Sequence, residues 1–160
     1  YVSLAEITNP HMEKGSLADV IKGADIFIGV SGPNVLTADM IRSMNTDPIV
    51  FAMANPEPEI LPDLAKEAGV RIMGTGRSDF PNQINNVSVF PGLFKGALRV
   101  RAREINEAMK LAAAQAIADY IPEADLNEEN IMPSALNKNV ADAVADAVAQ
   151  AARDTGAARI

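Results

Sequence analysis

Cysteine and tryptophan are absent from this chain of 160 residues, which also contains only one histidine. The lack of cysteine excludes disulfide bonds and thiolate metal sites within these residues. A protein that uses no disulfide bond is compatible with a reducing compartment. We therefore expect a cytoplasmic protein.

Long apolar runs and an excess of basic residues are missing as well. No hydrophobic segment approaches the roughly 20 residues that a membrane-spanning helix needs. The 14 lysine and arginine residues are outnumbered by 21 aspartate and glutamate residues, which gives a net charge of -7. Because such a surface repels phosphate groups, the charge argues against nucleic acid or an anionic membrane as a partner.

Two motifs of dinucleotide and metal chemistry are also missing. The glycine pattern G-x-G-x-x-G, which forms a phosphate-binding turn, does not occur, and no carboxylates gather at the spacing of metal ligands. The chain begins with Tyr1 and not with methionine. We therefore expect these residues to be part of a longer protein.

Short apolar runs alternate with helical patterns in the first half of the chain. Runs rich in β-branched residues predict buried parallel strands at residues 26–30, 49–54 and 70–73. Helices are predicted between them, at residues 17–22, 37–44 and 59–68. This alternation is typical of βαβ units. It predicts an α/β fold with a Rossmann-like, doubly wound parallel sheet from which the first strands are missing, followed by C-terminal helices.

The second half of the chain is dominated by helix-forming residues. Their density predicts one long helix from Pro91 to about Tyr120. Residues 121–138 form an acidic connector. After it, Val140, Val144 and Val148 recur at a spacing of four residues, which predicts an amphipathic helix with one apolar face.

The residues that follow the predicted strands form a candidate ligand site. Parallel strands end at the same edge of a sheet, and doubly wound sheets bind ligands outside that edge. Asn55 follows the second strand, and its amide can both donate and accept hydrogen bonds. The first strand ends in small residues that would let a flat nucleotide lie against the backbone: Gly29, Val30, Ser31 and Gly32. Together these strand ends predict a nucleotide-dependent site.

Four side-chain amides occur within five positions after the third strand, at Asn82, Gln83, Asn85 and Asn86. Such a cluster is costly to bury without partners and is well suited to holding a polar ligand. The same residue types also cap helices and close turns. From the residues alone, both interpretations stay open.

The stretch TGRSDFPNQINNVSVFPGLFKG, with the following GALRVRAREIN, resembles the malic enzymes, especially the shorter bacterial type. In that family an Asn-Asn doublet is closely followed by Phe-Pro-Gly, as it is here, and the resemblance covers essentially the whole chain. Two departures, Arg99 after Gly-Ala-Leu and Leu136-Asn137 near Pro133, bear on the subgroup and not on the family.

The resemblance implies that the full-length protein oxidises and decarboxylates malate to pyruvate and CO₂ and reduces NAD or NADP. It implies that Asn55 and Asn86 bind malate, that Asn85 lies near the nicotinamide, and that residues 29–32 face the nucleotide. The family's Mg²⁺ or Mn²⁺ ligands and its acid-base pair would precede Tyr1. This chain would then contain no catalytic or metal-binding residue and would be inactive by itself.

On this basis residues 1–120 are predicted to be the C-terminal half of a dinucleotide-binding domain, on which the connector and helix of residues 121–160 pack. The remaining N-terminal half of the same enzyme is the expected partner. A sheet that lacks its first strands has an exposed edge, so we also expect a homo-oligomer. Two alternatives stay open: half of another dinucleotide-dependent dehydrogenase, such as one acting on amino acids, and a non-catalytic interaction module.

Overall fold

The structure, a computed structural model, describes residues 2–160. The chain divides into two compact units, Tyr1–Ile72 and Met73–Ile160. Among the described residues, no helix is both long enough and apolar enough to cross a membrane.

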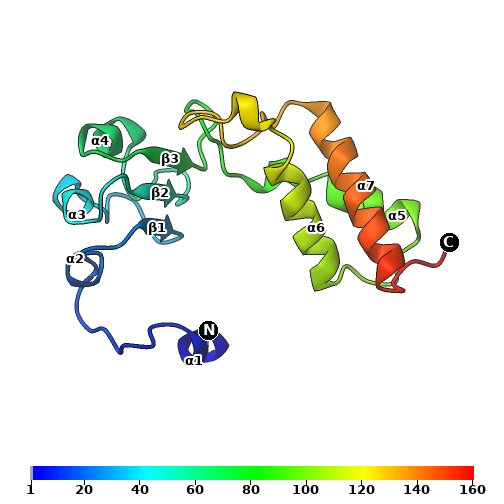
Figure 1. The fold of residues 1–160 in the computed structure, drawn as a ribbon, viewed down its shortest axis with the longest axis horizontal. Coiled ribbons are helices and arrows are strands. Elements are labelled where there is room, and N and C mark those ends of the chain that lie inside the picture. The colour runs from blue at the N-terminus through cyan, green and yellow to red at the C-terminus, as the bar shows by residue number, and fades with distance from the viewer. Residues whose placement is uncertain (1) are drawn as a thin grey trace. The chain divides into compact units, whose positions relative to one another are not determined.

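The first unit contains the beginning of a three-stranded open sheet with strand order β1-β2-β3. Strands β1 (Ile26–Gly29) and β2 (Ile49–Ala52) pair in parallel, with Ile26 opposite Ile49 and Gly29 opposite Ala52 (Figure 1). Strand β3 (Ile72–Thr75) follows at the boundary of the two units. The strand order and the parallel pairing confirm the predicted α/β class.

Four short helices belong to this unit: α1 (Val2–Ile7), α2 (Leu17–Val20), α3 (Ala38–Arg42) and α4 (Pro62–Glu67). Helix α1 was not predicted. Ser16 precedes α2 as its N-cap, and the hydroxyl of Thr37 caps α3 by accepting a hydrogen bond from the backbone N–H of Met40 at 3.3 Å. These caps confirm the helix starts that the sequence indicates.

Several details of these elements differ from the predictions, and α2, α3 and β2 each end two residues earlier than predicted. Strand β1 is not buried, because the side chains of Ile26 and Ile28 are 52% and 63% exposed. Strand β3 begins two residues later than predicted, at Ile72. Helix α4 begins only at Pro62, because Leu61 is extended and the proline occupies the first turn.

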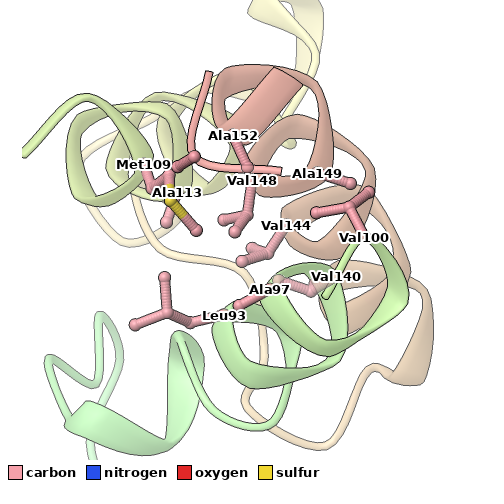
Figure 2. Packing of buried hydrophobic residues seen from close by; sticks show 11 residues of the cluster. Leu93, Ala97, Val100, Met109, Ala113, Val140, Val144, Val148, Ala149 and Ala152 are labelled. Carbon is pink, nitrogen blue, oxygen red and sulfur yellow. The ribbon is translucent and has the colours of Figure 1, made fainter. Parts of the chain in front are cut away.

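The second unit is built around α5 (Gly92–Arg99), α6 (Glu107–Ala118) and α7 (Lys138–Asp154). Short 3₁₀ turns, η1 (Asn86–Ser88) and η2 (Glu123–Asp125), precede α5 and follow α6. Figure 2 shows the apolar side chains of the three helices pointing toward one another. Val140, Val144 and Val148 are all buried in this core, which confirms the predicted apolar face of α7.

The single helix predicted from Pro91 to Tyr120 is wrong. The chain leaves the helix after Arg99, and Arg101 has a positive φ of 48°. Val100 is fully buried, and its carbonyl accepts a hydrogen bond from the backbone N–H of Arg159 at 2.9 Å. A new helix then begins at Asn106, whose side chain accepts a hydrogen bond from the N–H of Met109. Contacts with the C-terminal residues therefore outweigh the local helix propensity.

Candidate functional site

The ends of β1 and β2 lie side by side in the first unit. The backbone N–H of Met53, just after β2, donates a hydrogen bond to the carbonyl of Gly29 at 3.0 Å. The loops that leave the two strands are joined further on, because the N–H of Asn34 donates to the carbonyl of Pro58 at 3.1 Å. The parallel pairing thus brings the residues after β1 next to Asn55, as the strand order requires.

A buried glutamate connects these two loops. Glu59 is fully buried, and its Oε1 accepts hydrogen bonds from the backbone N–H of Ser31 at 2.7 Å and from the Ser31 hydroxyl at 3.1 Å. Its Oε2 accepts a hydrogen bond from the backbone N–H of Ala54 at 3.0 Å. One carboxylate therefore holds the residue two places after β1 and the residue two places after β2.

The environment of Glu59 affects its protonation in two opposite ways. Burial raises the pKa of the carboxyl group, but the hydrogen bonds from Ser31 and Ala54 favour the ionised form and leave the pKa below its ordinary value of 4.5. Gly29 provides the space for this carboxylate, since a Cβ atom there would lie 2.5 Å from Cδ of Glu59. The lowered pKa therefore favours the ionised form of Glu59. A residue larger than glycine at position 29 would occupy the space of its carboxylate.

Because folding lowers the pKa of Glu59, the free energy of unfolding should decrease when this carboxylate is protonated in acid. The stabilising contribution of the carboxylate is complete above the ordinary value of 4.5 and is lost as the pH falls through the lower pKa of the folded state. Glu59→Gln should flatten this part of the pH dependence, and Glu57→Gln, at an exposed position of the same loop, is the matched control variant. Urea denaturation at a series of pH values measures both variants. An acid dependence unaltered by Glu59→Gln would contradict this role.

The other predicted residues of this edge are open to ligands. Asn55 is exposed, and in the described part of the chain its side chain makes no hydrogen bond. Val30 is 79% exposed, and a Cβ atom at Gly32 would meet no atom within 4 Å. Among the residues predicted at this edge, Asn55 therefore has a free side-chain amide, and Gly32 has open space beside its backbone.

The asparagine side chains of the second unit have different roles. Asn82 is buried, and its Nδ2 donates to the carbonyls of Met73 at 3.0 Å and Glu128 at 2.8 Å. Its Oδ1 accepts a hydrogen bond from the N–H of Ile131 at 2.9 Å. With its hydrogen bonds used in this way, Asn82 joins the end of β3 to the connector and is not a ligand-binding residue. Of the two interpretations that the sequence leaves open for the amide cluster, the structural one therefore applies to Asn82.

Asn85 and Asn86 are both exposed, but only one of them has a structural task. The side-chain oxygen of Asn85 accepts a hydrogen bond from the N–H of Val87 at 3.0 Å and caps η1. The side chain of Asn86 makes no hydrogen bond within residues 2–160, although its backbone carbonyl accepts from Val89 and Phe90. The amide of Asn86 is therefore free for a ligand and does not cap α5.

Basic side chains near this stretch are occupied by ion pairs. Lys95 and Arg99, both on α5, pair with Asp142 and Asp146 on α7. The hydrogen bond from Lys95, together with its charge, lowers the pKa of Asp142. These pairs are exposed and contribute little to stability. They also give Lys95 and Arg99 a structural explanation that involves no ligand.

A cavity of about 440 Å³ lies between the residues before α5 and the first turn of α7. Its walls include Val87, Phe90, Pro133 and Leu136, together with the paired side chains of Lys95 and Asp142. Neither Asn85 nor Asn86 lines this cavity. The free amide of Asn86 therefore belongs to the exposed surface and not to the cavity.

No group of three or more histidine, cysteine, aspartate or glutamate side chains is placed to hold a metal ion within residues 2–160. The ligand-binding roles expected for Asn55, Asn85, Asn86 and residues 29–32 stay predictions. Sequence reasoning missed Glu59, which was interpreted as the start of a helix. The only signal in the sequence was the position of this glutamate between Pro58 and Ile60. Because both neighbours are buried, an exposed charge between them would be unexpected.

Comparisons with known proteins agree with this architecture. A family model described as "Malic enzyme, NAD binding domain" matches residues 68–153. The NAD-dependent malic enzyme of Geobacillus stearothermophilus is 61% identical over 155 residues, which are 97% of this chain and 32% of that protein. The NADP-dependent malic enzyme of Escherichia coli is 48% identical over 161 residues, which cover 91% of this chain and 21% of that protein.

A solved structure gives the same result for the fold. The crystal structure of malic enzyme from Pyrococcus horikoshii superposes with a TM-score of 0.88 at 50% identity, over 94% of this chain and 35% of that one. The chain thus spans between about a fifth and about a third of the length of these relatives. With the family model matching more than half of the residues, the chain belongs to the family of malic enzyme NAD-binding domains.

Proposed function

We propose that this chain is part of a malic enzyme that converts malate to pyruvate and CO₂ while it reduces NAD or NADP. In this reaction a hydride leaves C2 of malate for the nicotinamide and the C2 hydroxyl loses its proton. The bond between C3 and the adjacent carboxylate then breaks with release of CO₂, and C3 of the resulting enolate takes up a proton to give pyruvate. Membership of the family of malic enzyme NAD-binding domains carries the proposal. The free amides of Asn55 and Asn86 support it, because a carboxylate accepts hydrogen bonds from amide donors.

Each predicted site residue has a proposed role. The amide N–H groups of Asn55 and Asn86 would donate to malate, and Asn85 would lie near the nicotinamide. Gly29, Val30, Ser31 and Gly32 would face the nucleotide, and the open space at Gly32 supports a close approach of a ligand to the backbone there. The dinucleotide, when bound, accepts the hydride. Binding and orientation are therefore the tasks that we assign to this chain.

A divalent cation, Mg²⁺ or Mn²⁺, belongs to the proposal for the full-length protein. The described residues do not fit such an ion, since none of their acidic groups and histidines form a suitable cluster. We therefore assign the metal ligands to the part of the enzyme outside this chain, and the resemblance to the malic enzymes places the acid-base residues there as well.

The proposal also concerns assembly and organisation. Residues 1–120 would be the C-terminal half of the dinucleotide-binding domain, with residues 121–160 packed on it. The common core of α7 with α5 and α6 supports this packing, whereas the compact units of the structure divide after Ile72. The exposed apolar side chains of Ile26 and Ile28 on β1, and of Val30 directly after it, support association with further polypeptide. We propose a homo-oligomer located in the cytoplasm.

The decisive experiment is the substitution Asn86→Ala in the full-length protein. Loss of one hydrogen bond to the charged substrate should raise the Michaelis constant for malate by roughly tenfold to a hundredfold. The melting temperature should stay nearly unchanged, because the side chain is exposed and makes no hydrogen bond within the described residues. Malate-dependent reduction of NAD or NADP and a thermal melt of the same variant give both values.

Asn139→Ala provides a matched control, since Asn139 is also an exposed asparagine whose side chain makes no hydrogen bond in the described chain. It should alter neither the Michaelis constant nor the melting temperature. A destabilised Asn86→Ala variant with an ordinary Michaelis constant would end the assignment to malate. A wild-type protein without any malate-dependent reduction of NAD or NADP would favour the non-catalytic interaction module.

A further inference from the structure

We infer that Glu59 is a positioning residue, which holds the loops after β1 and β2 in the arrangement that the dinucleotide and malate require. This inference rests on the proposed function of the two loops. It concerns a residue to which neither the sequence pattern nor the family membership assigned a role. The residues that carry it all belong to the first unit.

Glu59 is a charged group in a fully buried place, and its carboxylate accepts hydrogen bonds from uncharged groups of Ser31 and Ala54. A buried charge is costly unless hydrogen bonds replace its lost hydration. Here these hydrogen bonds come from Ser31, in the loop after β1, and from Ala54, in the loop after β2. The ionised state of Glu59 and the positions of the loops therefore depend on each other.

Only a carboxylate satisfies both loops at once. Oε1 accepts from the N–H and the hydroxyl of Ser31, and Oε2 accepts from the N–H of Ala54. A glutamine of the same shape has one acceptor oxygen and one donor amide. Its NH₂ group would face a backbone N–H in one of the two loops, so that one loop would lose its connection.

One anchored residue, Ser31, is itself among the residues proposed to face the nucleotide, and the other, Ala54, is a direct neighbour of the proposed malate-binding residue Asn55. Ser31 lies between Val30 and Gly32, and Ala54 precedes Asn55, whose amide is free. A shift of either anchored N–H would move these neighbours, and small displacements of binding groups reduce ligand affinity. Because Glu59 is fully buried and uses both oxygens, it acts through the loops and does not touch the ligands.

The test uses the full-length protein with the substitutions Glu59→Gln and Glu57→Gln. Glu57 belongs to the same loop but is exposed, and it provides the matched control. At a temperature well below the melting temperature of each variant, Glu59→Gln should raise the Michaelis constants for the dinucleotide and for malate by roughly tenfold. Glu57→Gln should change neither constant. A lower melting temperature of Glu59→Gln with unchanged Michaelis constants would overturn the inference, since a merely structural role predicts that result.

A double-mutant cycle with Asn55→Ala tests the route of the effect. If Glu59 acts on malate by positioning Asn55, Glu59→Gln should raise the Michaelis constant for malate much less when Asn55 is already alanine. Fully additive effects would show that Glu59 does not act on malate through Asn55.

Should Glu59→Gln fail to fold, Glu59→Asp replaces it in both experiments, because it keeps the charge and both acceptors on a shorter side chain. Absence of malate-dependent activity in the wild-type protein would instead refute the proposed function, so the two failures are distinguishable.

Discussion

Asn82→Asp is expected to lower the free energy of unfolding by about 3–5 kcal/mol. The Nδ2 group of Asn82 donates to the carbonyls of Met73 and Glu128. Aspartate would place a second oxygen against these two carbonyls and would add a charge in a buried position. Only the hydrogen bond from the N–H of Ile131 could persist. Urea denaturation near neutral pH measures the loss.

The control for this substitution is Asn139→Asp, which introduces the same charge at an exposed position in the first turn of α7. There an acidic side chain is compatible with the helix dipole, so the free energy of unfolding should change by less than about 0.5 kcal/mol. Equal stability of Asn82→Asp and the wild-type protein would show that Asn82 does not join β3 to the connector in solution.

Gly96→Val should destabilise the second unit by about 3 kcal/mol. Helices α5 and α7 approach each other closely at this glycine, because a Cβ atom on Gly96 would lie 2.5 Å from the backbone oxygen of Ala145 and 2.8 Å from Cβ of Val148. The obstacle is partly backbone, which cannot turn away as a flexible side chain can. The two helices would therefore have to separate, and the core in Figure 2 would lose contacts.

Leu98→Val controls for the introduction of a β-branched residue into α5, since Leu98 is 76% exposed on the same helix. It should cost less than about 1 kcal/mol, which is the scale of helix propensity. Thermal and urea denaturation of both variants provide the comparison. If Gly96→Val were no less stable than Leu98→Val, the close approach of α5 and α7 at Gly96 would be wrong.

Much of the architecture was predictable because it depends on local patterns. Alternation of short apolar runs with capped helical segments indicated the α/β class, and the strand pairing confirmed it. The four-residue spacing of Val140, Val144 and Val148 indicated the buried face of α7. The helix predicted from residue 37 begins at Ala38, with Thr37 as its N-cap. Each of these signals lies within a few neighbouring residues, where helix geometry and side-chain periodicity decide the structure.

Other features depend on residues that are distant in the sequence. The long helix predicted after Pro91 divides after Arg99, because the buried Val100 bonds to the C-terminal Arg159. No glycine or proline marks this division within residues 100–106. The local propensity for a helix was real, but a distant hydrogen-bond partner and burial of one side chain decided against it.

The candidate site shows the same division between local and distant causes. The sequence by itself determined which polar residues follow the strands and that an Asn-Asn doublet precedes Phe-Pro-Gly. Only the tertiary structure decided that Asn82 is fixed by partners 46 and 49 residues away, while the amide of Asn86 is free. It likewise decided that Glu59 reaches Ser31, 28 residues earlier, and does not begin a helix. A short segment specifies which groups can form hydrogen bonds, but the partners they find depend on which distant backbone groups the fold brings within reach.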